Sequence, residues 1–134
     1  MTVTIASDLI DQILRAAAAS PQAEICGLLF GSRDRVTGIK PCPNVAADPS
    51  RWFEIDPATL LAAHRAARMD GPQIVGHYHS HPSGVAMPSP RDAAAAIPDG
   101  ALWLIAAAGK VSVWRAVRDG AIEDRFDPVE VQTR

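Results

Sequence analysis

Apolar residues follow two kinds of pattern along the chain, one typical of helices and one typical of strands. In two segments apolar residues recur every three or four positions, which is the period of an amphipathic helix. Ser7 can cap the first of these helices, and Asp56 followed by Pro57 can cap the second, with proline at its first helical position. Ser89 followed by Pro90 predicts a third, shorter helix. The predicted helices span residues 5–19, 56–69 and 89–96.

Short apolar runs bounded by glycine, proline and polar residues predict strands between and after these helices. The run 25–30 is nearly continuous, as in a buried strand, and the run 74–81 stops at Pro82. Gly109-Lys110 and Asp119-Gly120 predict hairpin turns. A helix between strands and a β-rich end indicate an α/β fold, in the α+β form of a mixed sheet flanked by helices. The predicted strands are 25–30, 36–40, 52–55, 74–81, 102–108, 111–117 and 122–126.

Length and composition narrow the class of protein. A chain of 134 residues suits a single domain, 1–134, and a composition that is 48% hydrophobic and 21% charged excludes disorder. The net charge of −2 provides no broad basic surface, so no nucleic-acid or membrane partner is expected. Asp8 and Asp11 interrupt the apolar start, which does not resemble a signal peptide. Cys26 and Cys42 lie in apolar surroundings and do not form a disulfide framework, so a cytoplasmic location is expected.

Three of the four histidines fall within five residues of one predicted strand. His77, His79 and His81 alternate, so their side chains share one face. Imidazole pairs two residues apart on a strand are rigid chelating groups for zinc. Chance clustering is the alternative, and the concentration of histidine at this one place favours a metal site over it.

Two carboxylates add to this cluster. Asp92 lies eleven residues after His81, and with Ser89 it forms a capping box that explains both residues without any metal. If the intervening loop folds back, Asp92 also becomes a third ligand, which leaves an open coordination position, as in catalytic sites. Glu24 precedes an apolar strand, where it is either an exposed strand-end carboxylate or a general base with a raised pKa.

These residues resemble the signature of the JAMM (MPN+) metalloproteases, the JAB-domain family, in its small stand-alone prokaryotic form. The resemblance rests on Glu24, on the string His79-Ser80-His81-Pro82, and on Ser89 three residues before Asp92. It covers nearly the whole chain and implies a cytidine-deaminase-like JAB/MPN architecture. It further implies one Zn²⁺ per chain, with His79, His81 and Asp92 as its ligands. Glu24 would be the general base and acid, and Ser89 would donate to the oxyanion.

The resemblance also implies a substrate. Family members cleave an amide bond after the C-terminal Gly-Gly tail of a ubiquitin-like or sulfur-carrier protein, which would lie extended beside a strand. The segments 44–53 and 83–88 would form the walls of its channel. A non-catalytic scaffold that binds ubiquitin-like proteins, and a zinc amidase acting on a small molecule or a cell-wall peptide, remain as alternatives. The sequence indicates no oligomeric state.

Several other residues carry simpler interpretations. His77 departs from the aromatic residue that many family members have there and is interpreted as structural or as a neighbour of the ligands. Ser80 is expected to support the site from the opposite face of its strand. A cysteine protease built on Cys26 is disfavoured because that thiol lies in an apolar strand. His64 is expected on a helix flank, and the three tryptophans are expected in the core. They are Trp52, Trp103 and Trp114.

Overall fold

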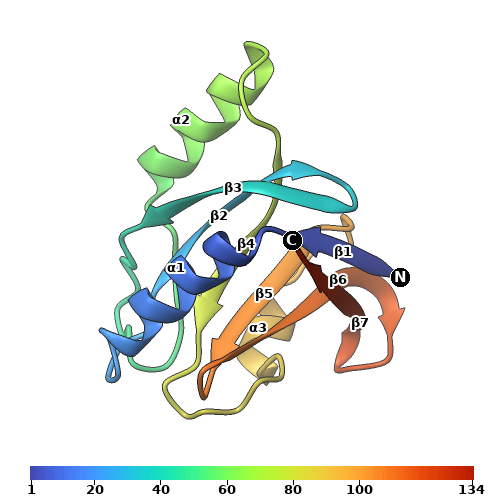
Figure 1. Ribbon diagram of the computed structural model, residues 1–134. Coiled ribbons are helices and arrows are strands. Elements are labelled where there is room, and N and C mark those ends of the chain that lie inside the picture. The colour runs from blue at the N-terminus through green and yellow to red at the C-terminus, as the bar shows by residue number, and fades with distance from the viewer.

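Seven strands and three helices make up the structure, a computed structural model that describes residues 1–134 (Figure 1). The strands form one sheet in the order β1-β3-β2-β4-β5-β6-β7, and the parallel pairing of β1 with β7 closes it into a barrel. The mixed sheet with helices predicted from the sequence is confirmed. In chain order the elements are β1 (Thr2–Ile5), α1 (Ser7–Ala18), β2 (Cys26–Ser32), β3 (Arg35–Cys42), α2 (Pro57–Arg68), β4 (Ile74–Ser80), α3 (Pro90–Ala95), β5 (Leu102–Ala107), β6 (Lys110–Gly120) and β7 (Asp124–Thr133).

The structure of the N-terminal residues differs from the predicted start of the first helix. A helix starting at Ile5 and capped by Ser7 is wrong, because Thr2–Ile5 is a strand and the helix follows Ala6, which makes no side-chain cap. Val3 and Ile5 alternate with two half-buried threonines, which is the period of a strand, and both apolar side chains are fully buried between β3 and β7. Because the alternation covers only four residues, Thr2–Ile5 could be recognised as a strand only from its pairing with β3 and β7.

Five further predictions, on β3, on the segment 52–55 and on the last three strands, are wrong. Of the expected strand 52–55 only Ile55 forms a bridge, to Asn44, and β3 continues through Pro41 where a loop was expected. The expected strand 122–126 is displaced to Asp124–Thr133, because β6 runs on through the predicted Asp119-Gly120 turn. The β5–β6 hairpin turns at residues 108–109, both at positive φ, one position before the predicted turn.

One face of the sheet encloses the main core. Every strand contributes at least one buried side chain to it, and α1 adds Ile10 and Ile13. Tyr78 lies on this face of β4 directly across from Gly27, where any side chain would collide with the tyrosine ring. Gly27 is therefore required for the packing between β2 and β4.

The opposite face of β2, β4 and β5 carries two smaller clusters and faces α2 and α3. Trp103, Ile105 and Ala93 belong to the cluster at α3, and Leu28 and Ala63 to the cluster at α2. His77 and His79 are on this outer face, paired with Leu28 and Cys26. The predicted histidine face thus lies between two helices that do not touch the main core. None of the three helices is both long and apolar enough to span a bilayer.

Candidate metal centre

His79 and His81 reach the same point from the end of β4. His79 is the last histidine inside the strand, and His81 follows it with its backbone N–H donating to the carbonyl of Ala106 at 2.9 Å. Both side chains are buried, and their Nε2 atoms lie 3.0 Å apart. A pair that close, held by two backbone ladders, is a rigid chelate for a metal ion.

Asp92 completes the group from the first turn of α3. Its Oδ2 atom lies 3.3 Å from Nε2 of His79 and 3.1 Å from Nε2 of His81. The capping box predicted from the sequence is present: Ser89 N–H donates to the same Oδ2 at 2.9 Å, and the Asp92 N–H donates to the Ser89 hydroxyl at 3.0 Å. The cap and the site do not compete, because the cap orients the carboxylate toward the histidines.

The donor set fits a bound cation. Nδ1 of His81 lies 2.8 Å from the carbonyl of Val85, which only accepts, so that nitrogen carries the hydrogen. In a neutral ring Nε2 then presents a lone pair to Asp92 at 3.1 Å. Two acceptors at that distance require a positive charge between them, either a proton or a metal ion.

The pKa shifts follow from the same contacts. Burial lowers the pKa of His79, which favours the neutral ring that a metal requires. Burial alone would also lower the pKa of His81, but hydrogen bonds with Asp92 and Val85 raise it. For Asp92 the hydrogen bonds from both histidines outweigh burial and hold its pKa far below the usual range. The site therefore pairs an anionic carboxylate with two nitrogen donors.

Glu24 lies beside this triangle, two residues before the start of β2. Its N–H donates to the carbonyl of Pro49 at 2.7 Å, and its own carbonyl accepts from the Asn44 side chain at 2.9 Å. Ser80 supports the site from the opposite face of β4, as expected, because its hydroxyl oxygen accepts a hydrogen bond from the N–H of Ile25 at 2.9 Å. These bonds fix the backbone on both sides of the carboxylate.

The Glu24 side chain is buried, and its Oε1 atom has no hydrogen-bond partner. Burial raises its pKa to about 7, although the neighbouring His81 opposes the shift. One of its oxygens lies within 4.8 Å of a ring nitrogen of both His79 and His81, so Glu24 is a possible ligand as well. Asp92 is the closer carboxylate, and its lowered pKa suits a ligand, whereas a pKa near neutrality suits a base.

Two aromatic neighbours of the histidines were not identified from the sequence. Phe53 stacks on His79, with ring centroids 4.3 Å apart and planes 21° apart. Trp103, expected only as core, packs edge-on against His77 at 4.3 Å. His77 faces the same side as His79, but its Nδ1 atom makes no hydrogen bond, and burial lowers its pKa to about 3. Phe53 lies in an irregular segment, where a lone aromatic carries no periodic signal.

A groove leads from the site along the outer face of the barrel. Two adjoining cavities, of about 640 and 730 Å³, share a lining from α2, α3, β4 and β5, and together they form the α2–α3 groove. The smaller cavity reaches Asp92, and the larger continues past His77 toward the start of β4. The residues common to both are Ile55, Leu60, His77, Ala95 and Trp103. Each cavity falls within the range of about 300–1,000 Å³ that is typical of ligand-binding pockets.

The remaining candidates lie as follows. Trp103 and Trp114 are buried, but Trp52 is half-buried at the groove, where the Arg91 guanidinium lies 3.8 Å above its ring, so its expected core position is wrong. His64 is exposed on α2, as expected. Cys26 is buried, and burial raises the pKa of its thiol to about 12, which excludes a thiolate nucleophile.

One protein family matches most of the chain, and similar curated proteins and a similar solved structure are known. The family described as prokaryotic homologs of the JAB domain matches residues 6–119. A desampylase from Haloferax volcanii is 38% identical over 109 residues, 77% of this chain and 78% of that protein. A probable TtuB-protein conjugate cleaving protease from Thermus thermophilus is 42% identical over 64 residues, 48% of this chain and 43% of that protein. The solution structure of a Desulfitobacterium hafniense protein superposes with a TM-score of 0.82 at 26% identity, covering 99% of this chain and 93% of that one.

Proposed function

The chain belongs to the family of prokaryotic homologs of the JAB domain, and on that premise we propose that it is a zinc-dependent isopeptidase. Its substrate is the amide bond after the C-terminal Gly-Gly tail of a ubiquitin-like or sulfur-carrier protein. The observation that carries the proposal is the triangle of His79, His81 and Asp92 with the buried carboxylate of Glu24 beside it.

The spacing of the donors supports zinc. Four donors arranged tetrahedrally at about 2.0–2.1 Å from a zinc ion are about 3.3 Å apart. The separations between His79, His81 and Asp92 are 3.0, 3.1 and 3.3 Å, so these side chains would hold one Zn²⁺ with little movement. Three protein ligands leave a fourth position open, as catalysis requires. When bound, zinc supplies Lewis-acid polarisation of the scissile carbonyl and makes water more acidic.

Glu24 is the general base and acid. Its pKa of about 7 lets it accept a proton from the attacking water and deliver that proton to the leaving nitrogen near neutral pH. The free Oε1 atom provides the lone pair for this step. Ile25 and Ser80 hold the backbone beside it, so the carboxylate does not have to be ordered during the reaction.

Ser89 donates to the oxyanion that develops on the scissile carbonyl. Its hydroxyl already accepts the N–H of Asp92, which fixes the oxygen at 3.0 Å and leaves its own hydrogen available to donate. A donor held in advance in this way costs no reorganisation during the reaction. The α2–α3 groove holds the extended tail that leads to the cleaved bond.

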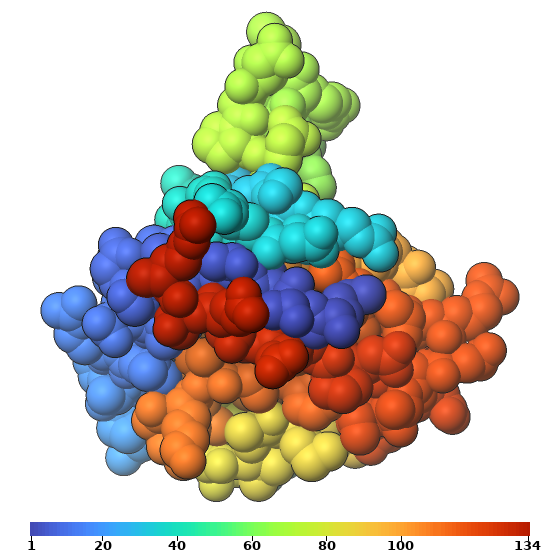
Figure 2. All heavy atoms as spheres, turned by 45° about the vertical axis from the view of Figure 1, so that its right-hand side comes forward, coloured from blue at the N-terminus to red at the C-terminus, as the bar shows by residue number.

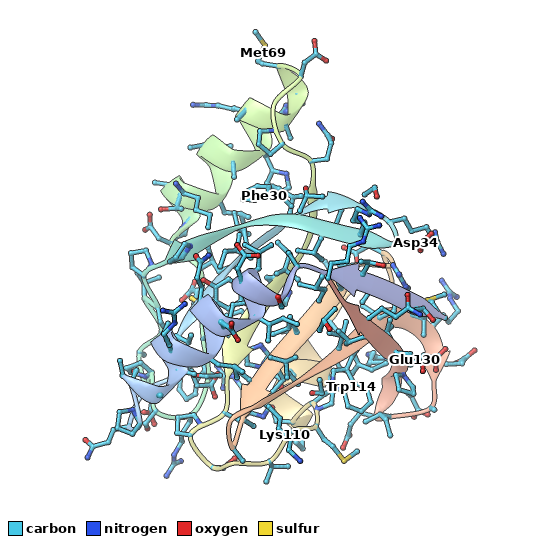
Figure 3. All side chains as sticks on the ribbon, in the orientation of Figure 1. Phe30, Asp34, Met69, Lys110, Trp114 and Glu130 are labelled. Carbon is cyan, nitrogen blue, oxygen red and sulfur yellow. The ribbon has the colours of Figure 1, made fainter.

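Glu24→Gln tests the proposal. The amide cannot transfer the proton, so turnover should fall by at least about 10²- to 10⁴-fold while zinc binding is retained. The measurements are metal content and cleavage of a ubiquitin-like protein joined through its Gly-Gly tail to a lysine side chain. Glu130→Gln is the matched control, because Glu130 is exposed on β7, outside the groove (Figure 3).

Other outcomes distinguish the alternatives. Near-normal turnover by Glu24→Gln contradicts the assigned base. A protein that binds no zinc is a scaffold. A zinc-loaded protein that cleaves no Gly-Gly conjugate is an amidase acting on another substrate.

A further inference from the structure

The two histidines of the site are held in different ways. Nδ1 of His81 donates to the carbonyl of Val85 at 2.8 Å, the arrangement by which a metal-binding histidine is usually oriented. Nδ1 of His79 is buried and has no hydrogen-bond partner among the atoms of the protein. The side chain is nevertheless fully enclosed, with 0% of its surface exposed. The only polar contacts of this ring are made by Nε2, the atom that would bind the metal, so Nδ1 contributes no hydrogen bond that fixes the plane of the ring.

Phe53 occupies the position from which that plane can be fixed. Its ring lies nearly parallel to the imidazole, with centroids 4.3 Å apart and an angle of 21°. Trp103 meets the same imidazole edge-on, at 6.1 Å and 86°. The Phe53 and Trp103 centroids are themselves 6.2 Å apart, so the two aromatic side chains contact His79 from neighbouring sides. Rotation of the imidazole out of its plane would lose the stacked contact with Phe53.

Phe53 is itself anchored, although its segment forms no strand. The side-chain oxygen of Asn44 accepts the N–H of the following residue, Glu54, at 3.0 Å, and the Asn44 amide donates to the carbonyl of the preceding residue, Trp52, at 3.1 Å. The same amide donates to the carbonyl of Glu24. One asparagine thus ties the stacking residue to the residue proposed as the base.

We propose that Phe53 is a positioning residue for the metal, which fixes His79 by stacking in place of the missing hydrogen bond. This inference rests on the metal site of the proposed function and adds a residue to it. Because zinc needs the His79 lone pair to point at one place, loss of the stack lowers the affinity for the ion. The Trp103 edge alone leaves one face of the imidazole free to tilt.

Two substitutions at residue 53 separate stacking from simple packing. Phe53→Leu keeps an apolar side chain and removes the aromatic face, whereas Phe53→Tyr keeps the aromatic face at a residue that lines the groove. Phe30→Leu is the matched control: Phe30, labelled in Figure 3, is also partly buried against the cluster at α2, whereas the ring contacts of His77 and His79 are made by Phe53.

The measurement is zinc affinity by competition with a chelator, together with the absorption bands of the Co²⁺-substituted protein. Phe53→Leu should bind zinc about 10- to 100-fold more weakly and shift the Co²⁺ bands. Phe53→Tyr and Phe30→Leu should stay within about threefold of the unchanged protein. The urea midpoints of the two leucine variants without metal should match, which excludes a general loss of stability.

Equal zinc affinities for Phe53→Leu and Phe30→Leu would overturn the inference, as would a loss for Phe53→Tyr as large as that for Phe53→Leu. Neither measurement uses the cleavage reaction. If zinc binds and depends on Phe53 but no Gly-Gly conjugate is cleaved, the proposed substrate is wrong and this inference stands. If conjugates are cleaved and zinc affinity ignores Phe53, the inference alone fails.

Discussion

Helices α1 and α2 both have twelve residues, but they differ in how much side-chain surface they bury against the barrel. Helix α1 inserts Ile10 and Ile13 into the main core, whereas Ala63 is the only buried residue of α2. Helix α2 projects from the body of the molecule in both views, with Met69 at its far end and 82% exposed (Figures 1, 2 and 3). One helix completes the core and the other forms a wall of the groove.

This difference separates stability from access to the site. A helix that buries large apolar side chains contributes to the free energy of folding, while one that buries a single alanine contributes little. The exposed and half-exposed side chains of α2 are available to a substrate instead. Substitutions in α1 should therefore change unfolding, and substitutions in α2 should change binding.

The largest effect is expected for Ile13→Ala. Ile13 is 1% exposed in the main core, and its truncation leaves a cavity where α1 meets the barrel. The free energy of unfolding should fall by about 2–5 kcal/mol in urea titration. Leu61→Ala on α2 is the control, because Leu61 is 47% exposed and should change stability by less than about 0.5 kcal/mol. Similar losses for the two variants would contradict the separation of roles.

An intermediate effect is expected for Asp56→Ala at the start of α2. The Asp56 carboxylate accepts the N–H of Thr59 at 3.1 Å and its hydroxyl at 2.9 Å. Loss of this cap should destabilise α2 by about 1 kcal/mol, seen as faster amide hydrogen exchange in the helix. Because α2 buries so little, the urea midpoint of the whole protein should move much less. A global loss equal to the local one would show that α2 folds together with the barrel.

The smallest effect is expected for Leu60→Ala, and it concerns substrate binding. Leu60 is half-buried and lines both cavities of the groove, so truncation should raise KM for a Gly-Gly conjugate about three- to tenfold with kcat unchanged. The neighbouring Leu61→Ala serves as the matched control, since Leu61 does not line the groove. An equal KM for both variants would exclude this groove as the tail-binding surface.

Most of the site could be predicted from motifs whose residues lie close together in the sequence. The alternation of His77, His79 and His81 requires only that the segment be extended; β4 confirms this for His77 and His79, and His81 follows directly after the strand. The pairing of Ser89 with Asp92 is a local capping motif and is present as predicted. The limits of α2 were predictable for the same reason, because Asp56 and Pro57 act on the next few residues alone.

By itself, therefore, the sequence determined those features that depend on neighbours within one turn of helix or one strand. Tertiary structure alone decided the closure of the barrel, which needs Val3 beside Val131, and the stack of Phe53 on His79. It also decided that Trp52 lies at the groove and not in the core. These contacts join residues far apart in the chain, and their energy is realised only when the whole sheet has folded, so no local period records them.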